Sequence, residues 1–262
     1  MVIINSKTCT GCGLCVKDCI SNALSLENGK AAYSGQCISC GHCAAICPSS
    51  SVSLPDYDMA DVEEYDNRLF DIDPDKLLRS IKFRRSVRDY EDKKIPVDII
   101  EKLLNAGRYT ATGSNRQGCR FVFVQDQLQT LRDLVWQSIE AAVSNPEKEL
   151  DWFHEPMTRF LKMRSESGTD YLFRNAPCVL YIAADSSIDA GLAAQNMEML
   201  AAANGLGALY NGFLVRAASL APETRDWLKV SDRPIQACML LGYPNVKYQR
   251  TAPRRKADAV LL

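Results

Sequence analysis

The sequence Cys9-Thr-Gly-Cys12-Gly-Leu-Cys15-Val-Lys-Asp-Cys19 has a counterpart in Cys37-Ile-Ser-Cys40-Gly-His-Cys43-Ala-Ala-Ile-Cys47. Both runs read C-x2-C-x2-C-x3-C, and an offset of 28 residues separates every cysteine from its counterpart. Such a repeat predicts two similar half-folds related by pseudo-symmetry. The spacing is typical of iron–sulfur clusters, in which three close thiolates hold one cluster and the fourth reaches the other cluster.

This crossed use of the fourth cysteine predicts two ligand sets. Two zinc sites are the alternative, but zinc favours paired C-x2-C units with a longer spacer between them. The segment resembles bacterial two-cluster ferredoxins, although Ile20 stands where the first run often carries a proline. We expect His42 to be a neighbour of a cluster and not a ligand. The predicted sets are Cys9, Cys12, Cys15 and Cys47 for one 4Fe–4S cluster, and Cys37, Cys40, Cys43 and Cys19 for the other.

The composition of the chain favours a reducing compartment. Of 262 residues eleven are cysteine, but the N-terminus lacks the basic and then apolar pattern of a secretion signal. We therefore expect a soluble, cytoplasmic protein with reduced cysteines, not a disulfide framework. The net charge is −1 and no apolar stretch approaches about 20 residues, which predicts neither a nucleic-acid partner nor a membrane span.

An acidic stretch without sustained periodicity, residues 56–73, separates the cysteine-rich segment from the remaining chain. Asp73-Pro74-Asp75 then offers a helix cap, a proline at the first helical position and an acid in the first turn. The predicted organisation is a ferredoxin-like domain over 1–55, a linker over 56–73 and a second domain over 74–262.

The second domain alternates helical and strand patterns. Because the strands are short and apolar on both faces, propensity alone suggests a doubly wound α/β sheet covered by helices. No G-x-G-x-x-G follows a strand, so the dinucleotide-binding fingerprint is absent. Pro156 is expected to break the fourth helix. The expected helices are 75–86, 97–107, 127–144, 147–165 and 187–204, and the expected strands are 120–125, 177–184, 206–210 and 235–241.

Three polar segments of this domain suit a flavin nucleotide. They are Arg84-Arg-Ser-Val-Arg88, Ala111-Thr-Gly-Ser-Asn-Arg-Gln117 and the stretch from Ala194 to Gly212. Taken alone, the first is more often a solvated face, the second more often an ordinary turn, and the third is equally explained by helix packing. With Leu241-Gly-Tyr-Pro244 and the basic 253–256, their order and spacing resemble the nitroreductase family of FMN enzymes. The resemblance covers about residues 75–256.

The resemblance implies an α+β sandwich and an intertwined homodimer with two FMN sites at its interface. Arg84 and Ser86 would contact the ribityl chain and phosphate, and Arg88 would lie near flavin N1 and O2. The segment 114–117 would reach the ring from the partner subunit, and the backbone at Tyr210 would lie near N5. The implied cofactor-binding residues are Arg84, Arg85, Ser86, Arg88, Ser114, Asn115, Gln117, Tyr210, Asn211, Gly212, Arg254 and Arg255, with Lys256 as an alternative beside Arg254.

The residues that would carry out catalysis are not evident from the sequence. The segment 145–175, which includes His154, falls where the family varies most and covers the substrate pocket. Ala111-Thr-Gly also departs from the Ala-Pro-Ser of many relatives.

The fusion of clusters with such a domain leaves three hypotheses for function. In the preferred one, electrons from an external ferredoxin pass singly through the clusters to FMN. The flavin then delivers a hydride equivalent to a small acceptor, such as a nitroaromatic, a quinone or an activated alkene. In the second, NAD(P)H reduces FMN and the clusters export electrons. In the third, the protein is a non-enzymatic redox sensor or electron carrier.

Overall fold

The computed structural model describes residues 1–69, 71–145 and 151–262. The chain divides into two compact units. Unit 1 comprises Met1–Asp71 with Thr112–Arg116, and unit 2 comprises Ile72–Ala111 with Gln117–Leu262. Within the described ranges, no helix has both the length and the apolar character that a membrane span requires.

Unit 1 is built from two similar halves. Strand β1 (Ile3–Ile4) pairs antiparallel with β4 (Val52–Ser53), and β2 (Leu24–Glu27) pairs antiparallel with β3 (Lys30–Tyr33). The short helices α1 (Leu14–Asp18) and α2 (His42–Ala45) contain the third cysteine of each run, and η1 (Met59–Asp61) follows β4.

The two short helices begin in the same way, as the repeat predicts. Gly13 precedes α1 with φ 73°, and Gly41 precedes α2 with φ 77°. Glycine adopts this left-handed conformation without steric cost, so the chain can turn sharply beside the cysteines. The core between the halves is small and consists of Val2, Leu24, Val52 and Leu54 together with the buried Cys9, Cys15 and Cys43.

Unit 2 contains a four-stranded sheet in the order β5-β6-β8-β7, in which every neighbouring pair is antiparallel. The α+β class is therefore confirmed, and the doubly wound arrangement suggested by propensity is wrong. Apolar strands buried on both faces look alike in sequence whichever way they run. The strands are β5 (Arg120–Val124), β6 (Cys178–Ala183), β7 (Gly207–Tyr210) and β8 (Ile235–Gly242).

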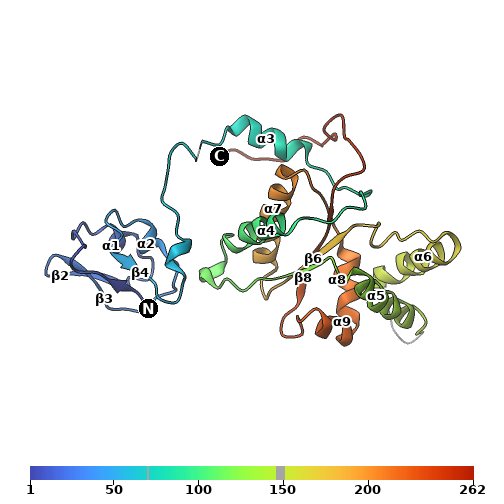
Figure 1. Ribbon diagram of the computed structural model, residues 1–262, viewed down its shortest axis with the longest axis horizontal. Helices are drawn as coiled ribbons and strands as arrows, with labels where there is room; N and C mark the ends of the chain where they lie inside the picture. The colour runs from blue at the N-terminus through green and yellow to red at the C-terminus, as the bar shows by residue number, and fades with distance from the viewer. Residues whose placement is uncertain (70, 146–150) are drawn as a thin grey trace. The chain divides into compact units, whose positions relative to one another are not determined.

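Helices cover both faces of this sheet (Figure 1). Val179 and Tyr181 of β6 belong to a core that includes α5 and α8, whereas Leu180 and Ile182 belong to a core that includes α4 and α7. This alternation explains why β6 is buried at every position. The helices of unit 2 are α3 (Pro74–Phe83), α4 (Val97–Arg108), α5 (Leu128–Val143), α6 (Asp151–Ser167), α7 (Ser187–Ala203), α8 (Gly212–Leu220) and α9 (Pro222–Trp227).

The expected break at Pro156 is also wrong, because α6 continues through it. Phe153 and Met157 on either side of the proline are fully buried in the core, so tertiary packing holds the helix despite the missing N–H. The first residues of that expected helix, 147–150, lie outside the described residues. Helices α8 and α9 were not expected from the sequence.

Candidate functional site

Cysteines from both runs lie together in unit 1. A small cavity is lined by all four members of one predicted set, Cys19, Cys37, Cys40 and Cys43. The fourth cysteine of the first run therefore lies with the first three cysteines of the second run.

The cysteines whose charges act on the buried thiols of Cys15 and Cys43 belong to the same predicted ligand sets. Burial raises the pKa of Cys15, and the nearby Cys47 and Cys12 raise it further. Burial likewise raises the pKa of Cys43, with further contributions from Cys37 and Cys40. The charge of Cys47 thus acts on the first set, although Cys47 belongs to the second run.

Backbone amides point at several of these sulfurs. The N–H of Ala23 donates to Cys19 Sγ at 3.3 Å, and the N–H of Ser51 donates to Cys47 Sγ at 3.3 Å, four residues further along the chain in both cases. The N–H of Ser39 donates to Cys37 Sγ at 3.2 Å. Amide donors stabilise anionic thiolates, so the site fits the thiolates that cluster binding requires.

His42 is directed at a carboxylate next to the cysteine runs. Its Nδ1 lies 3.1 Å from Asp18 Oδ2, and both side chains are exposed. Across the described residues, no group of three or more His, Cys, Asp or Glu side chains is arranged to hold a single metal ion. A cubane cluster is larger than an ion, and its thiolates stand further apart.

In unit 2 the arginine-rich segment is attached to the edge of the sheet. Helix α3 ends at Phe83, and the chain then forms a parallel bridge between Ser86 and Ala208 of β7. The N–H of Val87 donates to the Ala208 carbonyl at 3.0 Å. The segment therefore continues the sheet beyond β7, with Arg84 and Arg85 next to it.

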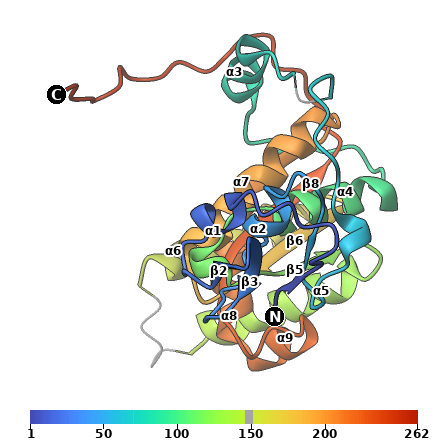
Figure 2. The same ribbon diagram turned by 90° about the vertical axis from the view of Figure 1, so that its left-hand side faces the viewer.

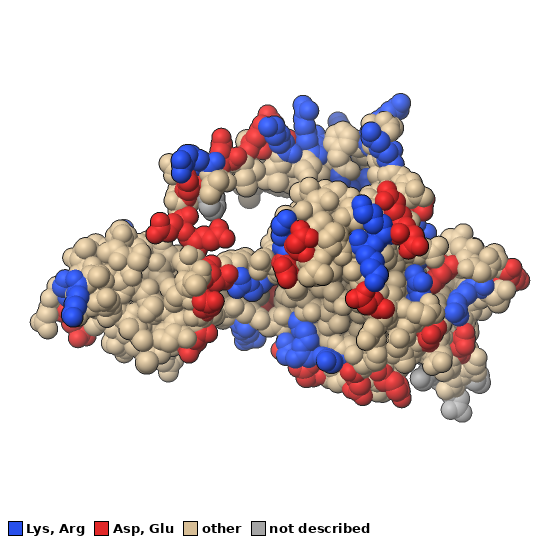
Figure 3. Space-filling model, in the orientation of Figure 1, with Lys and Arg blue, Asp and Glu red and all other residues tan. Residues whose placement is uncertain are grey.

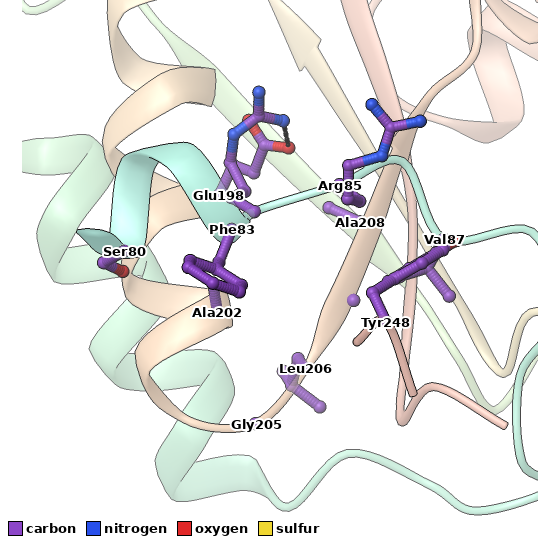
Figure 4. A pocket seen from close by; sticks show the side chains of 12 residues that line it. Ser80, Phe83, Arg85, Val87, Glu198, Ala202, Gly205, Leu206, Ala208 and Tyr248 are labelled. Atoms are coloured by element: carbon purple, nitrogen blue, oxygen red, sulfur yellow. Dashed lines mark hydrogen bonds and ion pairs between the residues drawn. The ribbon is translucent and has the colours of Figure 1, made fainter. Parts of the chain in front are cut away.

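A cavity of about 260 Å³ opens between this segment, α7 and the start of β7. Figure 4 shows Glu198 at one end of the cavity, with Phe83 and Tyr248 on either side of the space beneath it. The cavity is lined by two guanidinium groups, by aromatic rings and by glycine backbone. The lining includes Phe83, Arg84, Arg85, Glu198, Gly207 and Tyr248.

Glu198 is the functional candidate that the sequence analysis missed. Arg84 Nη1 donates to Glu198 Oε1 at 2.6 Å, and the Glu198 side chain is only 2% exposed. Its other oxygen, Oε2, is buried and has no hydrogen-bond partner among the described residues. In sequence, an isolated glutamate in an alanine-rich helix suggests a solvated face, and nothing local indicates a partner 114 residues away.

Comparison with known proteins identifies the family. A model described as the nitroreductase family matches residues 81–243, which is more than half of the chain. This chain belongs to the nitroreductase family. A second model, described as a 4Fe-4S dicluster domain, matches residues 1–64. The chain therefore combines an N-terminal dicluster domain with a nitroreductase-family unit, and the zinc alternative is not supported.

A curated relative from Methanothermobacter thermautotrophicus is named for NADH dehydrogenase and NAD(P)H nitroreductase activity. It is 25% identical over 145 residues, which are 52% of this chain and 60% of that protein. The nitroreductase-family chain thus spans less than two thirds of the length of this relative.

Solved structures share the fold of unit 2. A nitroreductase with bound FMN from Bacteroides fragilis has a TM-score of 0.58 at 23% identity, covering 71% of this chain and 99% of that chain. Another nitroreductase with bound FMN, from Desulfitobacterium hafniense, has a TM-score of 0.58 at 20% identity, covering 71% and 98%. A BluB-like flavoprotein from Clostridium difficile has a TM-score of 0.54 at 17% identity, covering 69% and 94%.

The predicted flavin residues of this nitroreductase-family protein fall into several groups. Arg84 and Arg85 line the cavity, Ser86 is bridged to β7, and Arg88 is exposed. Tyr210 ends β7, and its phenol pKa is raised, first by burial and then by the charge of Glu198. Tyr210 therefore lies electrostatically close to the Arg84–Glu198 pair.

The side chain of Asn211 has a structural role. Its Oδ1 accepts a hydrogen bond from the N–H of Leu214 at 3.0 Å and so caps α8, which begins at Gly212. Its Nδ2 donates to the Leu172 carbonyl at 2.7 Å. The Asn211 side chain is therefore engaged within unit 2 and is not available to a ligand.

The predicted segment 114–117 is divided between the units. Thr112–Arg116 belongs to unit 1, where Asn115 Nδ2 donates to the Ser39 carbonyl at 2.8 Å. Ser114, Asn115 and Gln117 all have positive φ, between 49° and 53°. Asn115 is therefore bound to the loop between Cys37 and Cys40, and neither it nor Ser114 lines the cavity of unit 2.

Arg254 and Arg255 lie in the exposed tail that follows β8, and neither lines the cavity. Figure 2 shows this tail passing α3 and running away from the sheet. Arg254 Nη1 donates to the neighbouring Pro253 carbonyl at 3.1 Å. Over unit 2, Figure 3 shows Lys and Arg side chains interspersed with Asp and Glu, in keeping with the net charge of −1.

Proposed function

We propose that the protein is an FMN-dependent oxidoreductase in which two 4Fe–4S clusters relay single electrons to FMN for the two-electron reduction of a small acceptor. The observation that carries this proposal is the combination, in one chain, of a dicluster domain with two four-cysteine runs and a nitroreductase-family unit. Clusters exchange single electrons, whereas a bound flavin exchanges either one or two.

The cavity of unit 2 fits the polar end of FMN. Guanidinium groups bind phosphate through paired N–H donors, and both Arg84 and Arg85 line the cavity. The bridge between Ser86 and Ala208 holds the segment that carries them against β7. Solved proteins of the same fold contain FMN, which supports the same cofactor here. From the resemblance, we propose that Arg88, Gln117, Gly212, Arg254 and Arg255 complete the site.

The cysteines of unit 1 would hold the clusters, and their surroundings favour the bound state. Peptide N–H groups at Cys19, Cys37 and Cys47 offset the negative charge of the thiolates. Because thiolates of this kind persist in a reducing compartment, we propose a cytoplasmic location.

We further propose a homodimer. The apolar side chains of α3 are left uncovered within one chain: Leu77, Leu78, Ile81 and Phe83 are each between 46% and 50% exposed. Contiguous exposed apolar side chains of this kind mark protein contacts, and a second copy of the chain is the partner that the family resemblance implies. Light scattering of the purified protein tests this, and a monomer at micromolar concentration would contradict it.

An anaerobic absorbance titration distinguishes the direction of electron flow. The purified protein receives NADPH, then NADH, then dithionite or reduced ferredoxin, while the flavin and cluster bands are followed separately. The proposal predicts that neither nucleotide bleaches the flavin within seconds, and that a low-potential donor bleaches the clusters first and the flavin afterwards. A protein with full cofactor content whose flavin accepts no electrons from reduced ferredoxin or dithionite would contradict it.

The opposite direction is the second candidate, and one finding favours it. The curated relative from Methanothermobacter thermautotrophicus is named for activities that use NADH and NAD(P)H. In that case a nucleotide would reduce FMN and the clusters would pass electrons to a protein partner. Rapid bleaching of the flavin by NADPH or NADH, followed by reduction of the clusters, would support this direction.

A further inference from the structure

The carboxylate of Glu198 is only half satisfied. Its Oε1 is bound by Arg84 at 2.6 Å, but its buried Oε2 has no donor among the described residues. A buried carboxylate oxygen without a donor is unfavourable, because it has lost its hydrogen bonds to water. Glu198 also lines the cavity, so a ligand in that cavity can supply the missing donor.

The position of Glu198 indicates which part of a flavin nucleotide would meet it. Arg84, on one side, is the residue proposed for the phosphate end. Gly207 and Ala208 line the same cavity and begin the strand that ends at Tyr210, whose backbone is proposed for the flavin ring. Glu198 therefore lies by the part of FMN that joins the phosphate to the ring, which is a chain of hydroxyl groups.

Other parts of the nucleotide fit Glu198 less well. A phosphate against Oε2 would bring two anions together in a buried place, which costs free energy. The ring carbonyls are acceptors, and the one N–H donor of the oxidised ring, at N3, lies on the edge away from the N10 atom that carries the ribityl chain and phosphate. A hydroxyl group donates a hydrogen bond, and its bond to a charged acceptor is stronger than one between neutral groups.

We propose that Glu198 is a cofactor-binding residue whose Oε2 accepts a hydrogen bond from a hydroxyl group of the FMN ribityl chain, while Oε1 holds Arg84 toward the phosphate. This inference rests on the proposed function, because it requires FMN in unit 2. Glu198 would therefore recognise the hydroxyl groups of the ribityl chain and would not recognise the flavin ring.

Three flavins separate these contributions. FMN carries the phosphate and the polyol, riboflavin lacks the phosphate, and lumiflavin lacks both. Their dissociation constants are measured by calorimetry on the full-length protein, with clusters loaded and flavin removed by dialysis. Glu198→Gln and Glu198→Leu are expected to raise the dissociation constant of riboflavin roughly tenfold, because each variant loses a hydrogen bond to a charged group. The dissociation constant of lumiflavin is expected to rise less than about twofold. The affinity for FMN is expected to fall at least as much as the affinity for riboflavin in the Glu198→Gln variant.

A matched control removes a carboxylate elsewhere in unit 2. Asp232 Oδ1 is bound by Arg120 Nη1 at 2.7 Å and does not line the cavity, so Asp232→Asn is expected to leave all three affinities unchanged. Riboflavin affinity within twofold of wild type in both Glu198 variants would overturn the inference. Equal losses for all three flavins would also overturn it, since general damage to the cavity gives that result. A wild-type protein that binds none of the flavins would instead refute the proposed function itself.

Discussion

Val87 lies directly against the backbone of Gly207, so closely that a β-carbon at position 207 would come within 2.3 Å of Val87 Cγ2. Side chains essentially never approach so closely, and the β-branched Val87 has little freedom to move away. The contact fixes the arginine-rich segment against β7, beside the bridge from Ser86 to Ala208. The geometry of the candidate flavin site therefore depends on the absence of a side chain at Gly207, which also lines the cavity.

Gly207→Ala is expected to push this segment away from β7. We expect a loss of about 1–3 kcal/mol in the free energy of unfolding, as for other overpacked sites, together with weaker flavin binding. Chemical denaturation and flavin titration measure the two effects.

Gly191→Ala in α7 is the matched control. A β-carbon there meets no atom within 4 Å, and alanine favours a helix over glycine. We expect this variant to be unchanged or slightly more stable. A Gly207→Ala protein with wild-type stability and affinity would show that the close contact is unimportant.

Tyr90 links the arginine-rich segment to β8. Its hydroxyl donates to the carbonyls of Val87 at 2.8 Å and Leu240 at 3.3 Å, and the side chain is buried. Tyr90→Phe is expected to lower the free energy of unfolding by about 1–2 kcal/mol, because both buried carbonyls lose a donor. Tyr248→Phe removes a hydroxyl that donates to the Ser86 carbonyl from an exposed ring, so it should cost less than about 0.5 kcal/mol. Equal effects in thermal unfolding would contradict this account.

Pairs of cysteine variants test the crossed ligand sets. Cys19 and Cys43 are assigned to the same cluster, so the double variant Cys19→Ala/Cys43→Ala should lose no more iron than either single variant, about four of eight irons per chain. Cys47 belongs to the other set, so Cys47→Ala/Cys43→Ala should lose both clusters. Iron analysis and electron paramagnetic resonance count them. Loss of both clusters from the first pair and of one from the second would reverse the assignment.

Asn115 offers a way to address one cluster selectively. Its Nδ2 donates to the Ser39 carbonyl, and the Ser39 N–H donates to Cys37 Sγ. Asn115→Asp places a negative charge at this loop, which disfavours adding an electron nearby. We expect the potential of the cluster held by Cys37 to fall by on the order of tens of millivolts, with a smaller change at the other cluster. A redox titration followed by electron paramagnetic resonance measures both, and equal shifts would contradict the prediction.

Much of the fold could be predicted because its signals are local. The cysteine spacing predicts both ligand sets, and the cap at Asp73 marked the start of α3, where its carboxylate accepts from the N–H groups of Asp75 and Lys76. Strand direction could not be predicted, because the apolar pattern of β6 is the same in a parallel and an antiparallel sheet. The continuation of α6 through Pro156 depends on packing against residues far away in sequence.

In the candidate site too, residues with a local sequence signal could be predicted and residues that depend on packing could not. Arg84 and Arg85 stand out as a basic run, and the structure brings both to the cavity. Glu198 could not be predicted, since its burial and its pairing arise only when α7 packs beside the end of α3. Asn115 was expected to reach a flavin ring from the partner subunit. Within one chain its amide donates to the Ser39 carbonyl, a contact that no local pattern indicates.

The relay itself is tested most directly by rapid mixing with reduced ferredoxin. Wild type and a Cys19→Ala/Cys47→Ala variant, which lacks one ligand of each cluster, are compared under anaerobic conditions while the flavin band is followed. Photoreduction of the flavin confirms that the variant still carries a reducible cofactor. The relay predicts flavin reduction after cluster reduction in wild type, and a rate at least tenfold slower in the variant. Equal rates of flavin reduction in the two proteins would contradict it, because electrons would then reach FMN without the clusters.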